Sequence, residues 1–129
     1  MNTFQAWLTD WAAWHEAQGD YASGYASSTP VWRAMMARRI TEFASCIPAG
    51  AEPPRDLARL CYGLNAVKAI PEHAGHVTAM QRYYIIRHYH GQGQEAARLT
   101  AEEYRIAPST AYEWKRSGER AVEQWLRAN

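Results

Sequence analysis

Polar side chains recur along "PSTAYEWKRSGER" (108–120) at a spacing that places them on one side of a helix. At about 100° per residue, Ser109, Glu113, Arg116 and Arg120 share a face. Arginine can bind guanine through two hydrogen bonds, glutamate can accept one from cytosine N4, and serine or threonine can bind bases or phosphates. This combination predicts a helix that reads the major groove of DNA.

Position along this helix separates base contacts from phosphate contacts. The N-terminal part of a recognition helix usually touches the bases. This rule favours the early residues as base readers: Ser109, Thr110, Tyr112, Glu113 and Arg116. Lys115 and Arg120 are expected to meet phosphates instead. The alternative is a solvated face, but two arginines four residues apart repel each other in a bare helix, which favours a bound anion.

The helix-turn-helix that would present this face is predicted over residues 94–126. Residues 94–104 form its first helix, in which Ala97 and Ala101 are small enough for a close crossing. Arg105 occupies the turn position that often holds glycine, and Ile106 is expected to fill the space between the helices. After Pro108, Ser109 or Thr110 would cap or open the second helix. The buried stripe of that helix is predicted to contain Ala111, Trp114, Gly118, Val122 and Trp125.

The rest of the chain also has helical periodicity and lacks sustained alternation of apolar and polar residues. Residues 3–18 carry apolar side chains three and four apart, and Gly19 is expected to end that helix before a loop over 19–28. Further helices are predicted at 30–47, 57–70 and 71–89, with breaks at "PAGAEPP" and "GQG". The predicted fold is therefore all-α, with five or six helices.

Composition favours one globular domain. The chain has 129 residues, of which 47% are hydrophobic, and its net charge is +1. We expect an aromatic-rich N-terminal part over 1–47 and a helical core over 55–129. Two cysteines without a CxxC motif, and no long apolar stretch, predict a reduced cytoplasmic protein with no membrane span and no secretory signal.

Aromatic and basic residues of the N-terminal part are candidate partner contacts. The helix tryptophans are expected in the core, whereas Tyr21 and Tyr25 fall in the predicted loop, where they could dock on a protein or stack on bases. Arg38 and Arg39 follow the apolar run "WRAMMA". They could end a solvated helix or contact polymerase or the DNA backbone.

Other chemistry finds little support in the sequence. His73 and His76 share a helix face, as two metal ligands would, but no paired cysteines or convergent carboxylates accompany them. No nucleophile–base set and no phosphate-binding loop with a lysine is recognisable. We therefore predict no enzymatic activity, no cofactor and no metal.

The C-terminal half, "AIPEHAGHVTAMQRYYIIRHYHGQGQEAARLTAEEYRIAPSTAYEWKRSGERAVEQWL" (69–126), resembles region 4 of sigma factors. More narrowly, it is similar to the small phage antitermination proteins Q, and "LTDWAAWHEAQGDYASGY" (8–25) looks like their tryptophan-rich opening. The resemblance implies a phage late-gene antitermination factor in the host bacterial cytoplasm. Its partners would be double-stranded DNA near a late promoter and bacterial RNA polymerase, with the sigma factor as a further candidate.

Two alternatives remain open at this point. A helix-turn-helix regulator would bind DNA and act at initiation without engaging polymerase during elongation. A small helical structural or interaction protein would not use the polar face of 109–120 for DNA at all. Terminator readthrough separates antitermination from regulation at initiation, and replacement of Glu113 and Arg116 separates both from the third class.

Overall fold

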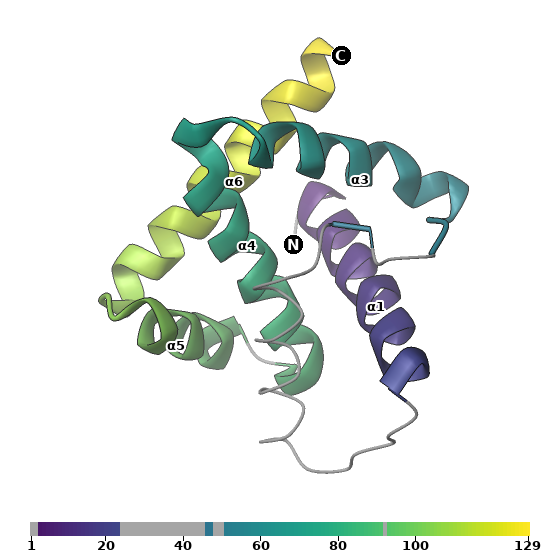
Figure 1. Cartoon of the computed structure of the whole chain (residues 1–129). Coiled ribbons are helices and arrows are strands. Elements are labelled where there is room, and N and C mark those ends of the chain that lie inside the picture. The colour runs from purple at the N-terminus through teal and green to yellow at the C-terminus, as the bar shows by residue number, and fades with distance from the viewer. Residues whose placement is uncertain (1–2, 24–45, 48–50, 92) are drawn as a thin grey trace.

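The computed structural model describes residues 3–23, 46–47, 51–91 and 93–129. These residues form five helices and no strand, which confirms the all-α prediction (Figure 1). The helices, with the labels of Figure 1, are α1 (Thr3–Ser23), α3 (Arg55–Lys68), α4 (Pro71–His90), α5 (Gly93–Tyr104) and α6 (Pro108–Ala128).

Proline and glycine set several of the helix boundaries. Pro71 and Pro108 lie in the first turns of α4 and α6, where the missing N–H costs nothing. Gly91 ends α4 in the left-handed conformation, with φ of 71°, and its N–H donates to the Arg87 carbonyl at 2.7 Å. The predicted breaks before α4, α5 and α6 are therefore confirmed.

Two predicted boundaries in the N-terminal part are wrong. The first helix does not end at Gly19, because α1 continues to Ser23. A glycine inside a helix costs only about 1 kcal/mol relative to alanine, so it does not stop a helix that packs well elsewhere. Cys46 and Ile47 lie in a bend, so the helix expected over 30–47 does not include its last two residues; the rest of that range lies outside the described residues.

Helix α4 lies at the centre of the described fold. It contacts each of the other four helices, with α6 as its most extensive neighbour. Every residue from Ala79 to Ile86 is buried, so this stretch of α4 is covered all round rather than along one stripe. In Figure 1, α1 and α3 lie on one side of α4 and α5 on the other.

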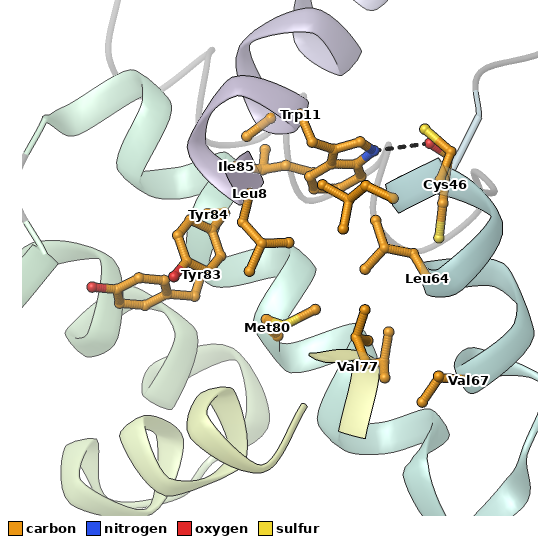
Figure 2. Close-up of a cluster of buried hydrophobic side chains, with 14 of the residues drawn as sticks. Leu8, Trp11, Cys46, Leu64, Val67, Val77, Met80, Tyr83, Tyr84 and Ile85 are labelled. Carbon is orange, nitrogen blue, oxygen red and sulfur yellow. Dashed lines mark hydrogen bonds between the residues drawn. The ribbon is translucent and has the colours of Figure 1, made fainter. Parts of the chain in front are cut away.

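The core joins the tryptophan-rich N-terminal helix to α3 and α4. Leu8 and Trp11 of α1 are fully buried with Leu64, Met80 and Ile85, as Figure 2 shows. The Trp11 indole N–H donates to the Cys46 carbonyl at 3.0 Å, which satisfies the polar edge of the ring. The predicted core role of the α1 tryptophans is confirmed: Trp7 and Trp14 pack partly buried against the same cluster.

Candidate nucleic-acid interface

A tight left-handed turn joins α5 to α6. Arg105 adopts φ of 55°, and its N–H donates to the Glu102 carbonyl at 3.3 Å. The Ile106 N–H reaches back to the Ala101 carbonyl at 3.0 Å. These two hydrogen bonds form a Schellman motif, which normally has glycine at the position of Arg105. The backbone of Arg105 thus adopts the left-handed conformation for which this turn position often holds glycine.

The N-cap of the second helix lies two residues before Ser109, the earlier of the two predicted caps. This N-cap residue is Ala107, no side chain caps the helix, and Pro108 is already helical. Ser109 and Thr110 therefore lie in the first turn of α6 and do not cap it. This correction moves both side chains onto the surface of the helix, where they remain available to a ligand.

Small and aromatic residues hold α5 and α6 against each other and against α4. Ala97 and Ala101 of α5 and Ala111 of α6 are buried, so the helix backbones approach closely. The Tyr104 ring meets Trp114 edge-on, with 5.8 Å between ring centroids. Helix α6 then runs from the turn past α4 toward the C-terminus (Figure 1).

The buried side of α6 largely follows the predicted stripe. Ala111, Gly118 and Val122 are buried, while Trp114 and Trp125 are partly buried. Gly118 marks a close approach to α4, since a Cβ atom there would lie 2.7 Å from the His76 carbonyl oxygen. The face opposite this stripe must consequently point away from the protein.

That opposite face is exposed as predicted. Ser109, Glu113, Arg116 and Arg120 are all exposed, and Tyr112 is 38% exposed beside them. The flanking Thr110 and Ser117 are half-buried. We call the surface of Ser109, Thr110, Tyr112, Glu113, Arg116 and Arg120 the reading face. Its residues span about three turns of one helix, a placement that suits the major groove.

The Tyr112 ring supports Arg116 on the reading face. The Arg116 guanidinium carbon lies 5.0 Å from the ring centroid, within the range of a cation–π contact. The Tyr83 ring meets Tyr112 edge-on at 6.3 Å and so braces it from α4. Arg116 is therefore presented by an aromatic stack that reaches into the core.

Lys115 does not lie on the reading face, and its predicted phosphate contact is wrong for this structure. The side chain is buried, and its ammonium lies 2.8 Å from Glu119 and 4.8 Å from the centroids of both Tyr83 and Tyr112. Two signals in the sequence could have shown this. Position 115 falls on the helical stripe of Ala111, and an acidic partner follows four residues later.

Glu119 links α6 to two other helices. It accepts hydrogen bonds from the Tyr84 hydroxyl of α4 and from the Gln5 amide of α1, each at 3.2 Å. Burial raises the pKa of Tyr84, and the neighbouring Glu119 carboxylate raises it further. The phenol therefore stays a hydrogen-bond donor to Glu119 at neutral pH, and this network fixes α6 against α1 and α4.

Ion pairing leaves a group of unpaired arginines around the reading face. Arg82 pairs with Glu103, Arg98 with Glu95 and Glu102, and Arg127 with Glu123. By contrast, four arginines in this half of the chain form no ion pair with any described carboxylate: Arg87, Arg105, Arg116 and Arg120. The net charge of +1 therefore conceals a local excess of positive charge.

The predicted partner contacts of the N-terminal part are mostly outside the described residues. Tyr21 lies within α1 and not in a loop, so that part of the prediction is wrong. Tyr25, Arg38 and Arg39 lie outside the described residues. Tyr21 thus belongs to a different helix from the reading face, which lies on α6.

The histidines of α4 belong to no larger group of potential metal ligands among the residues that the structure describes. The described residues contain no cluster of three or more potential metal ligands. His76 instead packs its ring 6.1 Å from Trp114 of α6. As for membranes, none of the helices over the described ranges is long and apolar enough to cross one.

No family model matches this chain, and no curated protein or solved structure matches it either. The geometry of α4, α5 and α6 and the sequence resemblance therefore carry the functional proposal.

Proposed function

We propose that this protein binds double-stranded DNA sequence-selectively, with α5 and α6 acting as a helix-turn-helix and α6 entering the major groove. One observation carries the proposal: the polar side chains of α6 point outward together, while its opposite side packs against α4 and α5. Because α6 is buried along one side and packs against both α4 and α5, its outer side chains are held in fixed positions. Direct base readout requires such positions.

The reading face has the chemistry for distinct base contacts. Arg116 can donate two hydrogen bonds to guanine, and Glu113 can accept one from cytosine N4. Both are exposed and lie three positions apart, so they are neighbours on the helix surface. Arg120, one turn further along, is suited to a phosphate. Ser109 and Thr110 in the first turn can bind either.

The charge pattern favours moderate affinity. Each phosphate that a protein neutralises contributes about −0.9 to the slope of log affinity against log salt concentration. If the three unpaired arginines other than Arg116 each neutralise one phosphate, the slope is about −2.7, well short of the larger slopes of strong binders. A protein of this kind gains from a second partner, because tethering raises the effective concentration of the DNA contact.

We infer that the second partner is bacterial RNA polymerase, and that the protein is a phage-type late antitermination factor acting in the host cytoplasm. The resemblance of 69–126 to sigma region 4 and to the antitermination proteins Q supports this finer proposal, and the modest charge agrees with it. Regulation at initiation by the same helix-turn-helix is the alternative outcome.

Selection from a pool of random duplexes tests the DNA proposal. We expect wild-type protein to enrich one motif, and expect Glu113→Gln and Arg116→Gln to relax the preference at single positions by about 1–3 kcal/mol each. Arg127→Gln is the matched control, because Arg127 is exposed on the same helix but lies at its far end and pairs with Glu123. Wild-type protein that enriches no motif would refute sequence-selective binding.

Transcription with purified polymerase tests the finer proposal. A template carrying the selected motif, a promoter and a downstream terminator should show increased readthrough only when motif and protein are both present. A change in the number of initiated transcripts without a change in readthrough would support the alternative.

A further inference from the structure

A groove of about 620 Å³ borders the reading face. It lies where the C-terminal part of α4 meets the first turns of α5 and α6. The side chains that matter here are Tyr83 and Arg87 from α4, Gln94 from α5, and Ser109 and Tyr112 from α6. Ser109 and Tyr112 belong to both surfaces, so the groove is continuous with the reading face.

The lining of this groove suits an anion. Arg87 is its only charged residue, and Gln94, Ser109 and Tyr83 add neutral hydrogen-bond donors. Two other hollows on the described surface differ, because carboxylates line both of them, Glu123 in one and Glu119 with Glu123 in the other. Of these three hollows of the described residues, the groove beside the reading face is the one that combines a cation with no acidic side chain.

Arg87 is partly buried, but no described carboxylate neutralises it. It is half-buried and forms no ion pair with a carboxylate of the described residues. Arg87 lies one turn after Tyr83 on α4, and both side chains line the groove. Burial raises the pKa of Tyr83, and the charge of Arg87 opposes that rise. A half-buried guanidinium beside a phenol has fewer conformations to lose than a surface lysine when it binds a ligand.

We propose that Arg87 binds a phosphodiester of the DNA strand at the edge of the major groove that α6 enters, with Gln94 and Ser109 as further donors. This inference rests on the proposed DNA binding and adds a residue of α4 to it. Phosphates flank the major groove on both sides, and contacts to them fix the register of a protein on the duplex. A guanidinium matches the paired oxygens of a phosphate, which a lysine does not.

The test compares Arg87→Gln with Arg116→Gln and with Arg127→Gln as the control. Binding to the selected duplex and to a mixed-sequence duplex is measured by fluorescence anisotropy between about 50 and 200 mM salt. We expect Arg87→Gln to weaken both duplexes about tenfold, to reduce the salt slope by about 0.9, and to leave the ratio between the two duplexes unchanged. Arg116→Gln should instead lower that ratio. Arg127→Gln should leave the affinities, the salt slope and the ratio unchanged.

A scan with neutral methylphosphonate linkages locates the contact. On the duplex in which the contacted phosphate has lost its charge, wild-type protein and Arg87→Gln should bind equally. Arg87→Lys keeps the charge and should lose only a fewfold of affinity. This loss, too, should disappear on the duplex in which the contacted phosphate is neutral. If Arg87→Gln fails to fold, as judged by circular dichroism, Arg87→Lys and the scan decide the question.

The outcomes separate the phosphate contact from the proposed function. If Arg87→Gln keeps the affinity and salt slope of the wild-type protein while Arg116→Gln loses sequence preference, the phosphate contact is overturned and the proposed DNA binding stands. A methylphosphonate scan with no position that removes the effect of the Arg87 variants would also overturn it. Wild-type protein that binds no duplex would refute both proposals.

Discussion

Replacing Gly118 by alanine tests the close contact that sets the direction of α6. A Cβ atom at this position would lie 2.7 Å from the His76 carbonyl oxygen and 3.1 Å from the Met80 Cβ. The second distance is about 0.4 Å short of the smallest favourable separation of two carbon atoms, about 3.5 Å. Both neighbours belong to the body of α4, so no side-chain rotation relieves the contact and the two helices must move apart.

The cost can be isolated with a second glycine. Gly75 lies in α4, and apart from the adjoining helix backbone no atom lies within 4 Å of the position that an added methyl group would occupy. Gly75→Ala therefore gains only helix propensity, about 0.8–1 kcal/mol. Gly118→Ala gains the same propensity but adds overpacking, which typically costs about 1–3 kcal/mol. Because the propensity gain is common to both variants, the difference between their free energies of unfolding reports the overpacking. We expect this difference to be about 2–3 kcal/mol, because the atoms that the added methyl group would contact are backbone and Cβ atoms, which cannot rotate away.

Urea unfolding of the wild-type protein and both variants, followed by circular dichroism, gives these free energies. Gly75→Ala should raise the midpoint and Gly118→Ala should lower it, with equal slopes if unfolding stays two-state. If Gly118→Ala is as stable as Gly75→Ala, then α4 and α6 do not approach as closely as described. In that case the placement of the reading face and of the Arg87 groove loses its structural basis.

Three further predictions concern the turn, the buried ion pair and the thiols. Arg105→Gly should stabilise the protein by up to about 1 kcal/mol in urea unfolding, because relief of the left-handed strain exceeds the added entropy of the unfolded chain; a lower midpoint would contradict this. Glu119→Ala should cost about 3–5 kcal/mol, mainly by leaving buried Lys115 without its partner. Lys115→Met in the same chain should restore part of that loss, because the Tyr84 hydroxyl still lacks its acceptor; no recovery would show that Lys115 is not the reason. Burial raises the pKa of Cys46 and Cys61 from 9.0 to about 11, so the unfolded chain ionises first and stability should fall from about pH 9 to about pH 11; a flat profile would contradict buried thiols.

Local signals in the sequence predicted most of the helix boundaries in the C-terminal half. Pro71, Gly91 and Pro108 act through their own backbone preferences, so their effect needs no knowledge of distant residues. The buried stripe of α6 was predictable for a similar reason, since helix periodicity places Ala111 and Val122 on one side. Gly19 misled because a glycine only weakens a helix, and contacts made elsewhere along α1 decide whether it continues.

Through-space neighbours could not be predicted in this way. Gln5 and Glu119 are 114 residues apart, and nothing in either segment indicates that they share a hydrogen bond. The groove beside the reading face is similar, because Arg87 and Ser109 line it together only when α6 packs back against α4. The reading face itself belongs to one helix and was predicted from it; the phosphate site depends on three helices and needed the structure.

The charge that a DNA duplex would meet depends on the fold and not on the totals. A protein with net charge +1 has little overall attraction for a polyanion. In the folded protein, however, carboxylates neutralise Arg82, Arg98, Lys115 and Arg127 locally. The arginines that remain in this half of the chain lie in the groove, the turn and the reading face. The carboxylates beside them are Glu113, which forms no ion pair with a described residue, and Glu119 and Glu123, which pair with Lys115 and Arg127. A duplex approaching α6 therefore meets a positive surface that the total charge does not reveal, yet one small enough that a second partner would raise its occupancy.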